Sequence, residues 1–139
     1  MARTRPTEYW NDSCAVDDLE YALSFGAVGA TANPTIVVDV WRKDPVAWRQ
    51  RVTTLAQERP AADVEELAWA VVEEMSTRGA RLLEPVFEAQ AGRQGRLSVQ
   101  TDPTLFRTPA KMIEQAVRFS SIAPNIIVLD RLRADFDGL

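Results

Sequence analysis

The sequence predicts an α/β fold in which parallel strands alternate with helices, and three observations lead to this class. Short runs of small or β-branched apolar residues recur along the chain at wide intervals. Longer segments with apolar residues at helical spacing separate these runs, and turn-forming residues close most of them. The resulting order, β-α-β-α-β-α-β, favours parallel strands that are joined by right-handed crossovers.

The first predicted strand covers residues 8–11 and leads directly into a helix. Asp12–Ser13 should begin this helix, because both residue types favour turns and helix N-caps. Gly26 is placed to end it in a left-handed conformation. The expected buried face of the helix consists of Val16, Leu19, Ala22 and Leu23.

The second predicted strand is the small, apolar run 27–32, which is typical of a strand buried on both faces. Asn33–Pro34 should end this strand in a loop. From residue 35 to about 52 the pattern is mostly helical, with Pro45 marking a joint, and residues 57–60 are expected to form a connection.

The clearest amphipathic helix begins after Asp63, which can cap the first turn while Glu66 reaches back to it. Its expected buried face consists of Val64, Leu67, Ala68, Val71, Val72 and Met75. Residues 80–90 carry a weaker helical pattern around Pro85, and the polar segment 92–95 predicts a turn into the next strand.

Residues 97–100 are predicted to form the third strand, which Asp102–Pro103 breaks. Thr108–Pro109 should begin another helix with a cap and a proline at its first position. Its expected buried face consists of Met112, Ile113, Ala116 and Val117. The β-branched run 126–129 predicts a fourth, buried strand, and the charged residues 130–139 are too few to bury much surface.

Composition excludes several classes of function. With 16 basic and 20 acidic residues, the net charge is -4, so we expect neither a nucleic-acid nor a membrane partner. No apolar run of about 18 residues and no signal-peptide core are present, which makes the cytoplasm the expected location. Cys14 is the single cysteine and histidine is absent, so the usual zinc sites and histidine triads are excluded and no metal or cofactor is expected.

Polar side chains follow each predicted strand, at the end where working residues gather in parallel α/β folds. These are Asn11, Asp12 and Ser13, then Thr31 and Asn33, then Gln100, Thr101 and Asp102, and finally Asp130. Taken singly, Ser13, Asp102 and Asp130 are explained as helix N-caps or turn formers. As a set, the strand-end residues predict a functional site at this edge of the sheet.

Three segments together carry a more specific resemblance: Trp10–Ser13, residues 26–37 and residues 95–100. Within them, the Thr-x-Asn-Pro sequence that ends at Pro34 is the most discriminating motif. In this order the segments resemble the first three strands of the transaldolase family, over roughly residues 8–128. The resemblance implies that residues 1–128 form the first four β/α units of a TIM-type (β/α)8 barrel, followed by an unmatched charged tail over 129–139.

The resemblance also implies a chemistry. Transaldolases are similar to class I aldolases: a lysine on the fourth strand forms a Schiff base with a ketose phosphate, and a dihydroxyacetone unit passes to an aldose phosphate in the pentose phosphate pathway. Asp12 is then expected to handle protons during carbon–carbon cleavage, and Thr31 to position a catalytic water. Asn33 and Ser13 are expected to bind substrate. The cationic Schiff base would keep Asp12 ionised, and a helix N-cap is the alternative role for Asp12.

Two positions depart from the family's pattern. Where this chain has Gln100, transaldolases commonly carry a glutamate that works through the catalytic water. A glutamine at this position looks more like the fructose-6-phosphate aldolase branch of the family. Leu129 stands near the place of the family's lysine, and the two lysines of the sequence, Lys43 and Lys111, lie in stretches predicted to be helical. The later strands, with their phosphate-binding serine and arginine, are missing too. We therefore expect a truncated or frame-shifted reading of a longer gene that is inactive by itself.

Two other interpretations stay open. One is a non-catalytic half-barrel that acts only as an assembly or binding partner, because four parallel strands leave two open sheet edges that favour self-association. The other is an unrelated binding domain of the doubly wound type. The sequence has no Gly-x-Gly-x-x-Gly or Walker motif, which argues against this interpretation.

Overall fold

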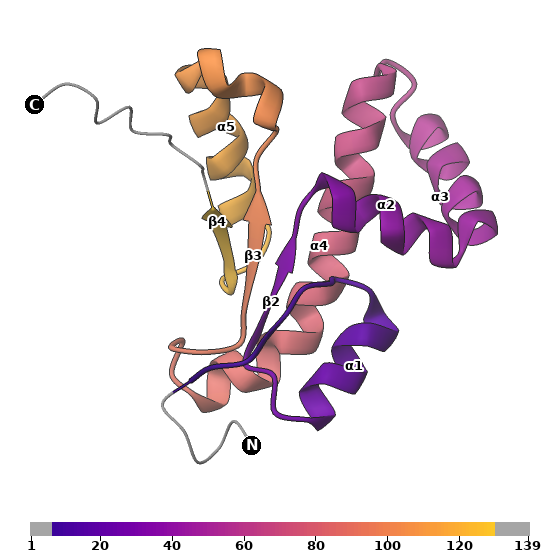
Figure 1. Cartoon of the computed structure of the whole chain (residues 1–139). Helices are drawn as coiled ribbons and strands as arrows, with labels where there is room; N and C mark the ends of the chain where they lie inside the picture. The colour runs from indigo at the N-terminus through magenta and orange to yellow at the C-terminus, as the bar shows by residue number, and fades with distance from the viewer. Residues whose placement is uncertain (1–6, 130–139) are drawn as a thin grey trace, which may run out of the picture.

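The computed structural model describes residues 7–129 and contains one parallel four-stranded sheet (Figure 1). The strands are β1 (Trp10–Asn11), β2 (Gly29–Ala32), β3 (Arg96–Gln100) and β4 (Ile126–Leu129). Each strand pairs with the one that precedes it in the chain, so the order across the sheet is β1-β2-β3-β4. This confirms the predicted α/β class with parallel strands and is consistent with part of a (β/α)8 barrel.

The helices are α1 (Val16–Ser24), α2 (Pro34–Lys43), α3 (Pro45–Glu58), α4 (Val64–Ala89) and α5 (Pro109–Ser120), with a 3₁₀ helix, η2 (Pro103–Arg107), before α5. Because no strand order reverses, right-handed crossovers place all of these helices on one face of the sheet. Figure 1 shows α1 beside the C-terminal half of the long helix α4, with α2 and α3 beside its N-terminal half. No described helix is long and apolar enough to cross a membrane.

The core lies between the sheet and α4. Ala30 and Ala32 of β2 and Leu97 and Val99 of β3 are at most 2% exposed, and they alternate along their strands as the two-residue period requires. On the helix side the core continues through Met75, Ala80 and Leu83. The residues between them on the strands, such as Thr31 and Gln100, face the other side of the sheet and are only partly buried.

Two predictions at the start of the chain need correction. Asp12–Ser13 do not cap α1: the N-cap is Ala15, which makes no side-chain cap bond, because two further residues of loop separate the strand end from the helix. Val16 was expected in the core but is 38% exposed, whereas Leu19 and Ala22 are buried as predicted. Gly26 follows the helix with φ of +89°, in agreement with its predicted role.

The loop predicted at Asn33–Pro34 is also absent. The Oδ1 of Asn33 accepts a hydrogen bond from the Ile36 N–H at 2.9 Å, and Pro34 occupies the first position of α2. An Asn-Pro pair suits both a turn and a capped helix start, and here the helix follows the strand at once. The joint predicted at Pro45 is confirmed, but α3 continues to Glu58, so the connection covers residues 59–63 and begins later than expected.

Helix α4 is longer than the pattern suggested, because it runs without a break through the weaker segment 80–90 and includes Pro85. The predicted buried face is only partly correct: Val71, Val72 and Met75 are buried, whereas Val64 is 84% exposed and Ala68 is exposed as well. Ala80 and Leu83 extend the buried face into the second half, while Pro85 is exposed. Packing against the sheet therefore outweighs the hydrogen bond that the proline removes. The predicted capping box at the other end is present, with reciprocal bonds between Asp63 and Glu66.

Helix α5 buries a different face from the one predicted. Met112 is buried as expected, but Ile113 and Val117 are 63% and 64% exposed, and Phe119 is buried instead. Arg118, on the flank beside α4, forms an ion pair with Glu73 of that helix. The 3₁₀ helix before α5 was not anticipated. The predicted fourth strand is present at residues 126–129, but its expected full burial is wrong: Ile126 is buried, whereas Leu129 is 58% exposed. Asp130 and the predicted tail beyond residue 129 lie outside the described residues.

Candidate functional site

Two of the residues predicted to be catalytic meet at the carboxyl ends of β1 and β2. Asp12 follows β1 directly, and Thr31 is the third residue of β2. The Thr31 hydroxyl donates a hydrogen bond to Asp12 Oδ1 at 2.5 Å, across a separation of 19 residues. The parallel register, in which Asn11 lies opposite Ala30, places the two side chains side by side one step further along both chains. Asp12 is exposed.

The loop that carries Asp12 is held by its two neighbours. Asn11 Nδ2 donates to the Ser13 carbonyl at 2.9 Å, and the Ser13 hydroxyl accepts from the Ala15 N–H at 3.2 Å. The same hydroxyl donates to Asp18 of α1 at 2.7 Å. Ser13 is thus a turn former, as its alternative reading suggested. Its expected contact with substrate stays a prediction.

Asp18 connects this loop to the next helix. One of its oxygens accepts from Ser13, and the other forms an ion pair with Lys43, the last residue of α2. The Lys43 ammonium, followed by the Ser13 hydroxyl, lowers the pKa of the Asp18 carboxyl below its ordinary value. Sequence reasoning missed Asp18, since an acidic residue in the first turn of a helix is common and marks no particular role.

The other predicted site residues lie at the same edge of the sheet in three different settings. Asn33 uses its Oδ1 to cap α2, which leaves its Nδ2 outside that bond. Gln100 is the last residue of β3 and pairs in register with Leu129. Asp102 is buried and caps η2 by accepting from the Thr104 N–H at 2.8 Å, as its alternative reading suggested.

Gln115 of α5 is a further residue that sequence reasoning missed. Its Oε1 accepts from the Asp102 N–H at 2.7 Å and so holds the loop that follows Gln100 against α5. A single glutamine within an amphipathic helix gives no signal of such a contact.

The strand end at which the resemblance predicts a lysine carries Leu129. Leu129 ends β4 and is 58% exposed. Lys43 lies at the end of α2 and is ion-paired, and Lys111 lies on the surface of α5. Both lysines are helical, as predicted, and neither stands at a strand end.

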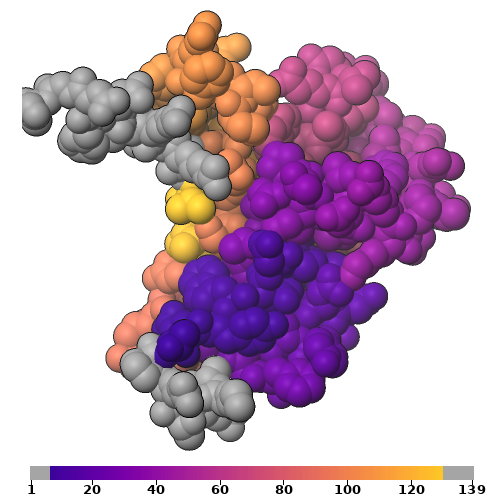
Figure 2. Space-filling model, viewed as in Figure 1, coloured from indigo at the N-terminus to yellow at the C-terminus, as the bar shows by residue number. Residues whose placement is uncertain are grey.

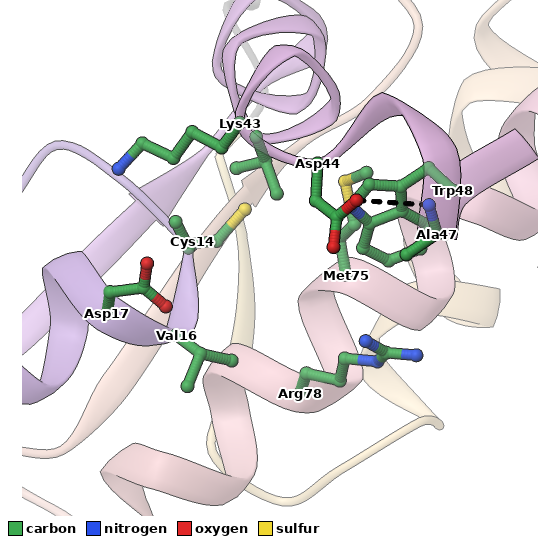
Figure 3. Close-up of a pocket in the computed structure, with 11 residues that line it drawn as sticks. Cys14, Val16, Asp17, Lys43, Asp44, Ala47, Trp48, Met75 and Arg78 are labelled. Carbon is green, nitrogen blue, oxygen red and sulfur yellow. Dashed lines mark hydrogen bonds between the residues drawn. The ribbon is translucent and has the colours of Figure 1, made fainter.

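A separate cavity of about 400 Å³ opens among the helices, away from the strand ends (Figure 3). Its lining includes Cys14 beside α1, Lys43 and Asp44 at the joint between α2 and α3, and Trp48 and Arg78. Burial raises the pKa of the Cys14 thiol to about 11, so this thiol is neutral at ordinary pH and is a poor nucleophile. Among residues 7–129, no group of three or more acidic or sulfur ligands is arranged to hold a metal ion.

Comparison with known proteins gives one consistent family. The model of the transaldolase/fructose-6-phosphate aldolase family matches residues 9–128. The transaldolase of Mycolicibacterium smegmatis is 31% identical over 136 residues, which are 94% of this chain and 36% of that protein. The transaldolases of Mycobacterium ulcerans and Mycobacterium marinum are each 31% identical over 103 residues, which are 73% of this chain and 27% of those proteins. The chain thus spans about a third of the length of the curated relatives that it matches.

Proposed function

Because the chain belongs to the transaldolase/fructose-6-phosphate aldolase family, we propose that residues 9–128 supply the proton-handling side of a barrel that acts on sugar phosphates through a lysine Schiff base. The observation that carries this proposal is the hydrogen bond between Thr31 and Asp12 at the ends of β1 and β2. Two polar residues that the family resemblance singles out independently lie in contact, on the side of the sheet that the helices leave uncovered.

The contact suits the chemistry of carbon–carbon cleavage. A carboxylate that accepts one hydroxyl keeps its second oxygen for substrate, and Asp12 would there take the proton of the sugar hydroxyl as the bond between carbons breaks. A neighbouring cationic imine would keep this carboxylate ionised. Thr31 would fix its orientation and share a water with it.

The residue at the end of β3 favours one of the two branches of the family. A glutamate could exchange protons with a water, whereas the amide of Gln100 can only donate or accept hydrogen bonds. We therefore place the chain nearer to the fructose-6-phosphate aldolase branch. Asn33 would offer its Nδ2 to the hydroxyls of the three-carbon unit while its Oδ1 caps α2.

A chimera tests this proposal directly. Residues 9–128 would be joined to the part of the M. smegmatis transaldolase that lies beyond the matched region. We expect aldol cleavage or transfer with fructose 6-phosphate, and a loss of about 10² to 10⁴ in turnover on Asp12→Asn. Asp17→Asn is the matched control, because Asp17 lies five residues after Asp12, in the helix that follows the same loop. This substitution should leave turnover unchanged. A folded chimera with no turnover, or one indifferent to Asp12→Asn, would contradict the proposal.

A second candidate is non-catalytic: by itself, the chain acts as an assembly partner. The observation that favours it is the pair of open edges at β1 and β4 in the described sheet. In the space-filling view, atoms of β4, drawn in yellow, are visible at the left margin of the described part (Figure 2). Edges of this kind invite pairing with another strand.

A further inference from the structure

The helical layer holds a cavity that the proposed function does not use. This is the cavity of about 400 Å³ that Figure 3 shows, and residues of α1, α2, α3 and α4 line it. Its lining falls within residues 14–78, and α1, α2 and α3 each pack against α4. Small-molecule sites have volumes of about 300 to 1,000 Å³, so a compact ligand fits this cavity.

The floor of the cavity is apolar. Val40, Trp48 and Met75 are buried side chains of three different helices, and all three line the cavity. The thiol of Cys14, which is buried as well, points into the same space (Figure 3). A floor of this kind favours the apolar body of a ligand, because the contact removes apolar surface from water.

The two cations of the lining already have partners within the chain. Lys43 forms an ion pair with Asp18 and extends its amine away from the cavity (Figure 3). Arg78 forms an ion pair with Glu74 at 2.6 Å, and its guanidinium lies over the Trp48 ring at 4.8 Å from the centroid. An anionic ligand would therefore have to compete with an internal carboxylate for either cation.

The two carboxylates of the lining are not neutralised in this way. Within residues 7–129, neither Asp17 nor Asp44 forms an ion pair. Asp44 Oδ1 caps α3 by accepting from the Ala47 N–H at 3.0 Å, and its other oxygen points into the cavity (Figure 3). The carboxylate of Asp17 faces the same space from α1 (Figure 3). The uncompensated charge around the cavity is therefore negative.

We propose that this cavity binds a small organic cation, namely a primary ammonium group attached to an apolar body. The ammonium lies between Asp17 and Asp44, where its three N–H donors meet carboxylate oxygens. The apolar body rests on Val40, Trp48 and Met75. Because the cavity lies away from the ends of the strands, this proposal does not depend on the proposed function, and the two can fail separately.

Titration of the 139-residue chain with phenethylamine, followed by NMR of the backbone amides, tests the class of ligand. Phenethyl alcohol has the same body without the charge, and hydrocinnamate carries the opposite charge. We expect saturable shifts at residues 14–17 and 46–48 with the amine, and binding of both analogues that is at least about tenfold weaker. Equal or tighter binding of either analogue overturns the proposal. Shifts confined to other residues, or no saturation with the amine, overturn it as well.

Substitutions that remove the two charges test the residues. Asp17→Asn combined with Asp44→Asn should weaken phenethylamine binding about tenfold or more, whereas α3 keeps its cap because asparagine caps helices as well as aspartate does. Glu20→Gln combined with Glu88→Gln is the matched control, since it removes the same total charge from exposed positions that do not line the cavity. Equal affinities of the two double variants would overturn the assignment. If a variant does not fold, the ligand series on the unmodified chain still decides between the outcomes.

Discussion

Asp18 is the residue on which the geometry of the Asp12 loop depends. Its carboxylate accepts from Ser13 at 2.7 Å and pairs with Lys43, so it joins the loop after β1 to the first turn of α1 and to the end of α2. Its role is therefore to hold the loop in place.

This arrangement gives stability a defined pH dependence. The pKa of Asp18 is lowered in the folded chain by Lys43 first and Ser13 second, from an ordinary value of 3.8. The stabilisation is then fully present above 3.8 and is lost as the pH falls through the folded pKa. Asp18→Asn should lower the free energy of unfolding at pH 7, and the difference from the unmodified chain should shrink at about pH 3.

Urea unfolding at the two pH values measures this difference. Asp17→Asn is the control, because Asp17 is the exposed neighbour of Asp18 on the same turn of α1. A difference for Asp18→Asn that stays constant or grows in acid would show that the carboxylate does not act through its charge.

Cys14 should be almost unreactive while the chain is folded. The thiol is 2% exposed and burial raises its pKa to about 11. Against the ordinary value of 9.0, the thiolate fraction near pH 8 falls by roughly 100-fold, and access falls as well. A disulfide exchange reagent should therefore label the native chain at least about 100-fold more slowly than the chain in denaturant. Similar rates would mean that the loop around Cys14 opens readily.

At the scale of elements, the turn from α4 into β3 is the most constrained connection. Gly95 has φ of +76°, and a Cβ at this position would lie 2.1 Å from the Phe87 nitrogen. The buried side chain of Asn125 donates to the carbonyls of Ala80 and Gly95, at 2.7 and 3.0 Å. This amide ties the helix, the turn and the start of β4 to one another.

The two turn glycines therefore differ in their tolerance of a side chain. Gly95→Ala should cost about 3 kcal/mol or more, because it adds an overlap with backbone to the cost of a positive φ. Gly26→Ala is the matched control: Gly26 has φ of +89° but no atom within 4 Å of a built Cβ, so only about 1 to 2 kcal/mol should be lost. Chemical denaturation compares the variants. Equal losses would show that the turn relaxes without cost.

At the scale of the whole molecule, the absence of a lysine at position 129 predicts that the chain has no aldolase or transaldolase activity by itself. Without a lysine at position 129 no Schiff base can form at the end of β4, so we expect no aldolase or transaldolase turnover from the purified 139-residue chain. Leu129→Lys alone should not restore it, because positioning of the substrate can be worth about 7 to 11 kcal/mol of the barrier and requires the rest of the wall. Borohydride reduction with fructose 6-phosphate, followed by intact-mass measurement, detects any adduct. A stoichiometric adduct at Lys43 or Lys111 would contradict this placement of the nucleophile.

The sequence by itself determined the class of the fold and much of its local structure. Some features depend only on residues that lie within a few positions of one another, so they can be predicted from the sequence. They are the strand at residues 97–100, the capping box at Asp63 and the left-handed conformation of Gly26. The strand-end position of Thr31 was readable for the same reason. The resemblance to a known family added the roles expected of these residues, which no local pattern contains.

Only the tertiary structure decided which groups meet and which faces are buried. The bond between Thr31 and Asp12 depends on the register of β1 against β2, and Asp18 finds Lys43 across 25 residues. Helix α5 has two apolar flanks, and its periodicity describes both equally well. Burial of Met112 and Phe119 against the core decides which flank turns inward and leaves Ile113 outside. Which side chains meet and which helix face is buried depend on contacts between segments that are distant in the sequence. These contacts form only when the chain folds, and their energies then exceed the local preferences of residues for helix or strand.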